Sequence, residues 1–361
     1  MGPQEILVFA AGATVVVAVF LSAVSTVVVP RGVPVRLTRA IFLTTRKLFE
    51  IRARVARTYE DRDRAYALYA PLTLVALPVV WLTLGLLGYT AVFWAMGARP
   101  LREAFTTSGS SLLTLGFAKV HDIPSTVCAF TEAIFGLILL ALLITYLPSM
   151  YGAFSRREVQ VALVSTFAGS PPWAVELLER FHLINGLDRL EDQVWVPWTG
   201  WFVEVEETHT SLSALPFFRS PQPDRSWVTA AGVVLDAASL YASTLDVPRS
   251  PPAELSIRTG YISLRTIADL FDIPYDPDPP PDGAISIARD EFDAACDRMM
   301  ATGLPVKEDR DQAWRDFIGW RINYDTVLIT LASMIRAPYA PWSSDRSAAR
   351  PYRPAMRRRR A

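Results

Sequence analysis

A short polar segment in the apolar half of the chain has the residue types of a pore-lining loop. Pro100 suits a first helical position, and Leu101–Leu113 is too short and too rich in serine and threonine to cross a bilayer. The loop Thr114–Ala118 and a polar turn follow, and a long apolar stretch begins near Ser125. Irregular backbone at membrane depth is tolerated only where protein buries it or where it lines water. The segment therefore predicts a loop beside a water-filled pathway.

The run SSLLTLGFA at positions 110–118 resembles the pore loop of the potassium-channel superfamily, whose filter commonly reads T-V-G-Y-G or T-I-G-F-G. The resemblance covers about residues 69–157. It implies that a threonine hydroxyl and successive backbone carbonyls replace the hydration shell of a permeating monovalent cation. Potassium is the expected ion, and no cofactor is implied. The expected ion-binding residues are Thr114, Leu115, Gly116, Phe117 and Ala118.

Two residues depart from the family pattern. Ala118 replaces the second glycine, and an L-residue reaches the backbone angles of that position only with strain of about 1–3 kcal/mol. Lys119 stands where the family often has aspartate, so a fourfold assembly would carry four positive charges near its outer mouth, which would repel cations or plug the pore. Asp122 is close enough to offset part of this charge. Potassium selectivity therefore rests on the resemblance alone.

Three polar residues are expected to support the filter: Ser110, Ser111 and Glu132. A carboxylate inside a membrane span costs roughly 2.5–3.5 kcal/mol and is by default a functional candidate. Glu132 either accepts hydrogen bonds from these serines or from Ser108 behind the loop, or it is a helix-start residue near the outer interface that the helix dipole favours.

Three apolar stretches predict membrane-spanning helices: Ile6–Val29, about Tyr69–Met96, and Ser125–Ser155. Apolar residues make up 51% of the chain, its mean hydropathy is +0.23, and the excess lies in the first 155 residues. A cleaved signal peptide is the alternative for the first stretch, but its flank is not basic and its apolar run is too long. In the third stretch, Gly136 and Pro148 are the expected gating hinge.

Charge sets the expected orientation. Residues 31–64 carry ten Lys or Arg and residues 97–124 carry three, so the first loop is expected inside and the N-terminus and filter loop outside. Arg36–Tyr59 has an amphipathic helical pattern. This helix either lies at the inner membrane surface against anionic headgroups, or extends a span into the cytoplasm. A plasma-membrane protein with a cytoplasmic C-terminal domain follows, and the Arg-rich, Lys-poor usage suggests a bacterial source.

The region after Arg156 predicts a mostly helical domain. Tandem prolines start a helix at 171–184, and Asp236 makes Trp227–Leu245 a buried helix rather than a fourth span. The other expected elements are a short strand at Trp201–Glu206, a loop at Pro274–Asp282, helices at Ile285–Thr302 and Asp309–Arg336, and a basic disordered tail over 341–361.

The residue types of known catalytic and nucleotide sites do not form a pattern in this chain. There is no G-x-G-x-x-G, and His121, His182 and His209 have no ligand-spaced neighbours. The carboxylates before His209 indicate a solvated face more than a metal or proton-sensing site. A core or subunit contact is expected for Trp195, Trp198 and Trp201. The sequence gives no case for an enzyme, a nucleic-acid partner or a small-molecule ligand.

Taken together, these features predict an all-α membrane protein with three transmembrane helices, a re-entrant pore helix and a filter loop, and a mostly helical cytoplasmic C-terminal domain. One loop per chain cannot close a carbonyl-lined axis, so the expected partner is the chain itself, as a homotetramer. The expected divisions are an N-terminal helix (1–30), a basic segment (31–64), a pore module (65–157), a cytoplasmic domain (158–340) and the tail. The alternative function is a non-conducting scaffold that tetramerises a cytoplasmic sensing or binding domain.

Overall fold

The computed structural model describes residues 2–28, 36–55 and 66–346 of the 361-residue chain. Within these ranges the regular structure is helical, and the only β pairing is an isolated bridge between Leu245 and Val306. The chain forms two compact units that divide between Gly152 and Ala153.

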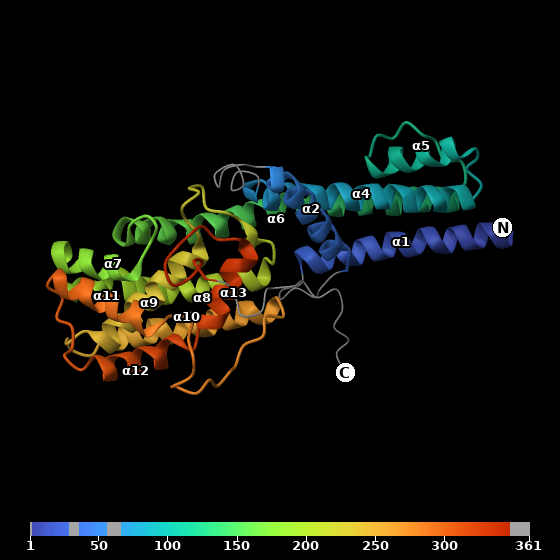
Figure 1. Cartoon of the computed structure of the whole chain (residues 1–361). Helices are drawn as coiled ribbons and strands as arrows, with labels where there is room; N and C mark the ends of the chain where they lie inside the picture. Colours follow the sequence, from blue (N-terminus) through green and yellow to red (C-terminus); the bar gives the residue numbers. More distant parts are fainter. Residues whose placement is uncertain (1, 29–35, 56–65, 347–361) are drawn as a thin grey trace. The chain divides into compact units, whose positions relative to one another are not determined.

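The first unit holds the apolar helices (Figure 1). They are α1 (Pro3–Val27), α4 (Tyr69–Ala95) and the first part of α6 (Ile123–Ala168), and all three are long and apolar enough to span a membrane. This confirms the three predicted apolar helices, each long enough to be a candidate membrane span. Two further helices complete the unit, α2 (Arg36–Val55) and α5 (Leu101–Leu112).

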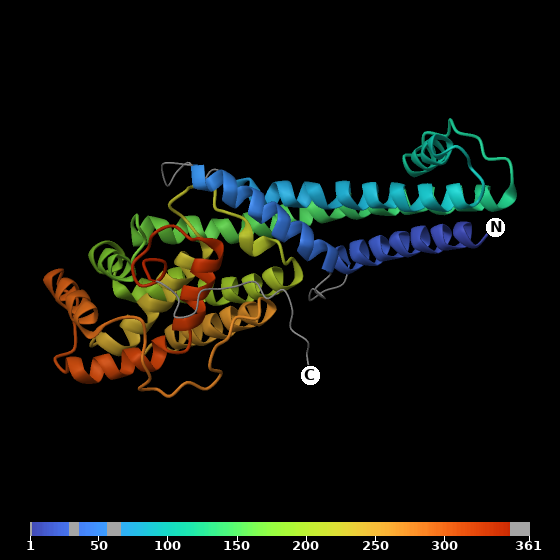
Figure 2. The ribbon, with the colours of Figure 1, turned by 45° about the vertical axis from the view of Figure 1, so that its right-hand side comes forward.

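Glycines allow the apolar helices to approach closely. A Cβ on Gly12 of α1 would lie 2.6 Å from the carbonyl oxygen of Gly88 on α4, and a Cβ on Gly85 would lie 2.6 Å from the ring of Phe135 on α6. In a membrane the hydrophobic effect does not drive helices together, so close backbone packing at small residues becomes important. Figure 2 shows α1 and α4 running alongside one another.

The predicted helix within the basic segment is present as α2. The Tyr69 hydroxyl of α4 donates a hydrogen bond of 3.2 Å to the carbonyl of Phe42, and the hydroxyls of Thr26 and Thr38 lie 2.8 Å apart. These contacts join α2 to α4 and to α1. Arg31 and the basic residues from Arg57 to Arg64 fall outside the described residues, and a position at the membrane surface stays a prediction.

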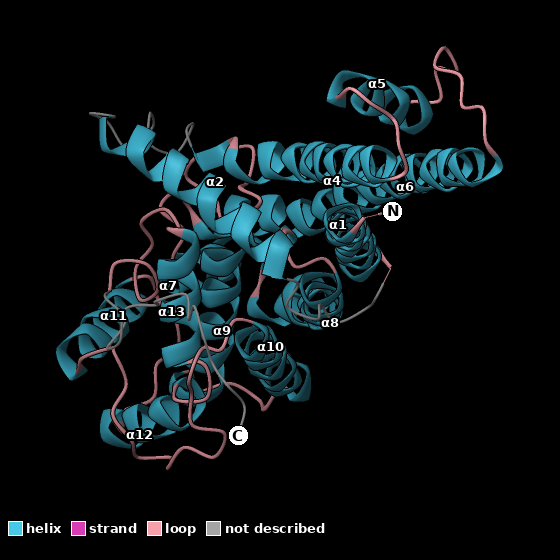
Figure 3. Cartoon of the chain, turned by 90° about the vertical axis from the view of Figure 1, so that its right-hand side faces the viewer, coloured by secondary structure: helices cyan, strands magenta, loops and turns pink. Residues whose placement is uncertain are grey.

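The second unit is a helical domain built around α9 (Figures 1 and 3). All 18 residues of α9 except Ala242 are buried, and the helix contacts α7, α10, α12 and α13. A helix that is apolar on every side is stable only in such an interior position. The helices are α7 (Ala174–Arg180), α8 (Val196–Ser211), α9 (Trp227–Thr244), α10 (Pro251–Leu270), α11 (Arg289–Ala301), α12 (Arg310–Arg321) and α13 (Asp325–Ile335). Short helical turns connect α7 to α8 and α8 to α9: η1 (Phe181–Asn185), η2 (Leu187–Arg189), η3 (Glu191–Trp195) and η4 (Leu215–Phe217).

Several predictions for this unit are confirmed. Trp227–Leu245 is a buried helix, Pro274–Asp282 is a loop, and the tryptophans at 195, 198 and 201 are core residues with at most 3% exposure. The predicted helix at 309–336 is present but broken: α12 ends at Arg321 and α13 begins at Asp325.

The predicted strand at Trp201–Glu206 is wrong, because this segment lies inside α8. Its alternation of apolar and acidic residues fits a strand over six positions. Over a longer window the buried residues Trp198, Trp201, Phe202 and Val205 recur at helical spacing, and these residues face the core. Burial of the helical face therefore outweighs the local preference for a strand.

Two further expectations fail in the same unit. Residues 341–346 are packed rather than disordered: Trp342 is 3% exposed, and the Arg346 guanidinium lies 2.7 Å from a carboxylate oxygen of Glu291. The rest of the predicted tail lies outside the described residues. His209 is fully buried, so it is not on a solvated face.

A buried ion cluster holds α9, α12 and α13 together. The Arg321 guanidinium, with 0% side-chain exposure, contacts Asp236 of α9 and lies 2.7 Å from the Asp325 carboxylate. The Tyr324 hydroxyl donates to Asp236 at 2.8 Å, and Arg321 also donates to the carbonyl of Trp342. Burial raises the pKa of Asp236, and the charge of Arg321 opposes this rise. The break between α12 and α13 brings both Arg321 and Tyr324 to this cluster.

Candidate functional site

The predicted pore helix and loop form a hairpin beside α4. The short helix α5 begins close to the end of α4, and the loop 113–122 returns to that same end, where α6 begins (Figures 1 and 2). Within α5, the buried positions include Ala104, Ser108 and Leu112 at four-residue spacing. The observed α5 matches the predicted helix at 101–113 to within one residue.

Ser110 fastens the loop to the last turn of α5. Its carbonyl oxygen accepts a hydrogen bond of 2.8 Å from the Leu115 amide, and its hydroxyl oxygen accepts one of 3.0 Å from the Ala118 amide. The Ser110 side chain is buried, with 2% exposure for the residue. Amides from the first and second halves of the loop are thus turned toward the same serine.

The sharp turns of the loop lie at Thr114 and Gly116, whose φ angles are 55° and 71°. Glycine adopts a positive φ freely, whereas a threonine there is strained by about 1–3 kcal/mol. Ala118 is not among the described residues with positive φ, so the strain expected at Ala118 is wrong. The chain makes its left-handed turn before it reaches Ala118, whose amide is then free to bond to Ser110.

Two apolar side chains of the loop are exposed: Leu115 at 60% and Phe117 at 61%. In the described part of the chain, no group donates a hydrogen bond to the carbonyl oxygens of residues 114–118. The loop therefore directs amides toward α5, and its carbonyl oxygens have no hydrogen-bond donor among the described residues.

The two expected mouth residues lie in the second part of the loop. Lys119 is exposed, and within the described residues it forms no ion pair with Asp122. The Asp122 carboxylate instead accepts a hydrogen bond of 2.7 Å from the Ser125 amide at the start of α6, and this bond lowers the Asp122 pKa. Asp122 thus acts on the first turn of α6.

Glu132 is buried between α5 and α6. It has 0% exposure, and its Oε1 accepts a hydrogen bond of 2.6 Å from the Ser108 hydroxyl. The other serines bond elsewhere: Ser110 holds the loop, and the Ser111 hydroxyl donates to the Thr107 carbonyl at 3.0 Å. Of the serines considered from sequence, Ser108 is the one that meets Glu132.

Gly136 lies where the end of α5 touches α6. A Cβ at this position would be 2.3 Å from the carbonyl oxygen of Leu112, so only glycine fits without moving one of the helices. Pro148 lies further along, inside the same continuous helix of 46 residues. The proposed hinge role of Gly136 and Pro148 stays a prediction, and the contact with Leu112 is a second reason for glycine at 136.

The C-terminal part of α6 belongs to the second unit, and Arg157 anchors it there. This side chain is buried and donates hydrogen bonds to the carbonyls of Leu215 and Phe218 at 3.0 and 2.7 Å. It also pairs with Glu158 at 2.8 Å, and one guanidinium nitrogen lies 3.3 Å from Nε2 of His209. Sequence reasoning missed this anchor, because two adjacent arginines after an apolar helix indicate an exposed helix end.

Acidic pH is expected to destabilise the second unit through His209. Burial, and then the positive charge of Arg157, hold the His209 pKa well below 6.5. Below about pH 6.5 the His209 imidazole binds a proton in the unfolded chain but stays neutral in the folded chain. The free energy of unfolding therefore falls by up to about 1.4 kcal/mol for each unit by which the pH decreases. The measurement is thermal unfolding of the detergent-solubilised protein between about pH 7.5 and about pH 5.5.

The matched variants are His209→Gln and His182→Gln. The first should remove this part of the acid dependence, and the second should retain it because His182 has no part in the Arg157 cluster. An equal pH slope in wild type and His209→Gln would contradict the assignment.

In the described residues, no group of three or more His, Cys, Asp or Glu is placed to hold a metal ion. Searches against protein-family models, curated proteins and solved structures find no match for this chain.

Proposed function

We propose that this chain is the subunit of a homotetrameric, potassium-channel-like cation channel of the plasma membrane. The observation that carries the proposal is the hairpin of α5 and loop 113–122, in which Ser110 draws the amides of Leu115 and Ala118 toward α5. Such a loop offers carbonyl oxygens to a cation, and a ring of such oxygens around an axis replaces the ion's water. One chain supplies one loop, so a closed ring requires several copies.

The three apolar helices support a membrane location for this loop. With the N-terminus outside, α5 and the loop would enter the bilayer from the outer side and return to the outer side. The second unit would lie in the cytoplasm. Glu132 and Ser108 would then lie behind the filter, where their hydrogen bond fixes α5 against α6.

Gating would act through α6, which is one continuous helix from Ile123 to Ala168. Its last part is held in the second unit by Arg157, so movements of that unit would be transmitted along the helix. Cleavage engineered at the Arg156–Arg157 bond should alter flux, and unchanged flux after complete cleavage would count strongly against this step.

A non-conducting scaffold is the second candidate. Lys119 favours it, because this exposed lysine has no acidic partner among the described residues and a tetramer would place four copies near the mouth. In that case the membrane part would assemble a sensing or binding domain without passing ions.

Cation flux from liposomes holding the purified protein tests both candidates. Potassium and sodium gradients are run in parallel for wild type, Ala118→Gly, Lys119→Asp and the double variant. The channel proposal expects wild-type flux with potassium favoured. Flux only in the double variant would mean that these two residues close an intact pore. Absence of flux in all four proteins, each folded and tetrameric, would favour the scaffold.

A pair of adjacent serines tests whether the loop geometry matters for flux. Ser110→Ala removes the acceptor of the Ala118 amide, so potassium flux or its preference over sodium should fall, by roughly tenfold if one hydrogen bond of ~1.4 kcal/mol is lost in the conducting state. Ser111→Ala removes only a bond to Thr107 within the same helix and should leave flux unchanged. Equal behaviour of the two variants would contradict the proposed role of Ser110.

A further inference from the structure

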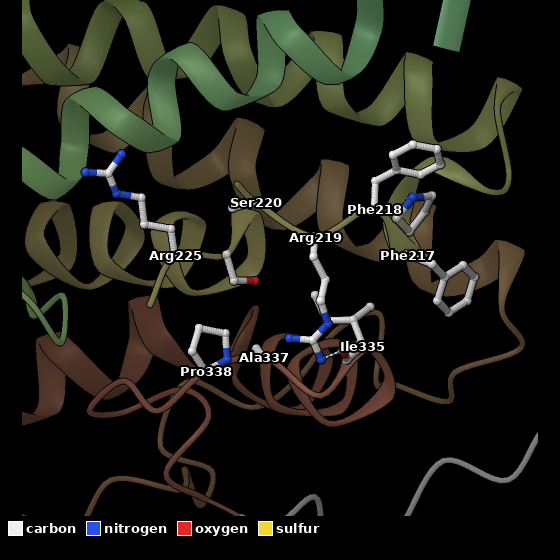
Figure 4. A pocket seen from close by; sticks show the side chains of 10 residues that line it. Phe217, Phe218, Arg219, Ser220, Arg225, Ile335, Ala337 and Pro338 are labelled. Atoms are coloured by element: carbon white, nitrogen blue, oxygen red, sulfur yellow. Dashed lines mark hydrogen bonds between the residues drawn. The ribbon is translucent and has the colours of Figure 1, made fainter. Parts of the chain in front are cut away.

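A small cavity of about 10 Å³ lies in the second unit, next to the N-terminus of α9. Figure 4 shows that its walls come from the segment before α9 and from the end of α13. The lining residues are Pro216, Phe217, Phe218, Arg219, Ser220, Arg225, Ser226, Ile335, Ala337 and Pro338.

Two buried hydroxyl groups at this cavity have no hydrogen-bond partner in the described part of the chain. They belong to Ser220, which is 6% exposed, and Ser226, which is 7% exposed. Buried polar atoms in native proteins nearly always have a partner, so an unpaired pair on one cavity indicates a bound species. Ser226 is also the N-cap residue of α9, yet its side chain does not cap the helix.

Three of the carbonyl groups around the cavity already accept hydrogen bonds. The Pro216 carbonyl accepts from Trp227 Nε1 at 3.0 Å, the Phe218 carbonyl from Arg157 at 2.7 Å, and the Ile335 carbonyl from Arg219 at 3.2 Å. The buried side-chain atoms at the cavity without a partner among the described residues are the hydroxyl oxygens of Ser220 and Ser226 and Nε of Arg225, and all three groups can donate. A bound species that accepts several hydrogen bonds therefore fits these donors.

The local charge is positive. Arg219 and Arg225 line the cavity and no Asp or Glu does. The Arg219 guanidinium bonds to the Ile335 carbonyl, and the Arg225 guanidinium points away from Arg219 (Figure 4). The 18-residue helix α9 adds the positive end of its dipole and its first, unbonded amides.

We propose that this cavity binds a small inorganic anion of the size of chloride. A cavity of this volume holds about one water-sized species. The anion would accept hydrogen bonds from the hydroxyls of Ser220 and Ser226 and would link the start of α9 to the segment 216–220. The proposal does not depend on ion conduction by the membrane helices.

Bromide, which scatters anomalously, identifies the occupant in crystals of the full-length protein. The expected result is an anomalous peak within hydrogen-bond distance of the Ser220 and Ser226 hydroxyls. A water molecule without anomalous signal, or no bound species at this position, would overturn the proposal. Because this experiment uses the wild-type chain, it decides the question even if a variant fails to fold.

Thermal unfolding gives an independent test in solution, with chloride replacing gluconate at constant ionic strength. The wild-type melting temperature should rise with chloride and saturate, by roughly 2–4 °C at several times the dissociation constant. The double variant Ser220→Ala/Ser226→Ala should lose this rise. Ser256→Ala is the matched control, because it removes another buried, unpartnered hydroxyl, and it should retain the rise. A chloride effect that is absent in wild type, or equal in the double variant, would contradict binding at this cavity.

Discussion

Gly136→Ala is expected to displace the end of α5 and to abolish or strongly reduce cation flux. The new Cβ would lie 2.3 Å from the Leu112 carbonyl oxygen, a distance that real Cβ atoms do not adopt. The helices must separate, and overpacking of this kind costs typically about 1–3 kcal/mol. Leu112 is two residues from Ser110, so the shift would reach the loop that Ser110 holds. The measurements are thermal unfolding in detergent and potassium flux in liposomes.

Gly109→Ala is the matched control within the same hairpin. Its Cβ would lie 3.7 Å from a methyl group of Leu86, an ordinary contact, and alanine is the better helix former. This variant should be as stable as wild type or slightly more so. The pair also separates two roles of Gly136: a pure hinge predicts changed gating at unchanged stability, and a stable, fully conducting Gly136→Ala would contradict the close-contact role.

Arg321→Met is expected to be the most destabilising change in the second unit, at about 3–5 kcal/mol. It leaves the Asp236 carboxylate buried with only the Tyr324 hydroxyl to stabilise its charge, and it removes a donor from the Trp342 carbonyl. The measurement is the free energy of unfolding by urea or heat. Arg249→Met is the control: this arginine pairs with Glu254 but its side chain is 77% exposed, so no measurable loss is expected.

The pH dependence of Arg321→Met gives a second check. Burial raises the Asp236 pKa, so the folded chain binds this proton more tightly than the unfolded chain. The free energy of unfolding then rises as the pH falls toward the unfolded value of about 4. Relative to wild type, which carries the same His209, the variant should recover part of its lost stability between about pH 7 and about pH 5. A constant difference across this range would show that the Asp236 carboxylate is not the destabilising group.

The sequence by itself determined the features that depend on local composition. A spanning helix needs only enough consecutive apolar residues to match the bilayer, so α1, α4 and the apolar part of α6 could be located without knowledge of any contact. The short helix α5 was bounded by Pro100 and the loop after Leu112. The buried helix α9 was recognised because Asp236 interrupts an otherwise spanning stretch.

Only the tertiary structure decided which distant residues meet. Ser108, rather than Ser110 or Ser111, bonds to Glu132, because the rotation of α5 against α6 selects one helical face. The segment 201–206, predicted as a strand, is part of α8, because burial of its helically spaced aromatic residues in the core stabilises the helix. The burial of Arg157 beside His209 was not visible either, because an arginine is buried only where carbonyl and carboxylate groups from other segments converge on it. Such convergence depends on the packing of α6 against the segments around residues 209–218, which no local sequence pattern records.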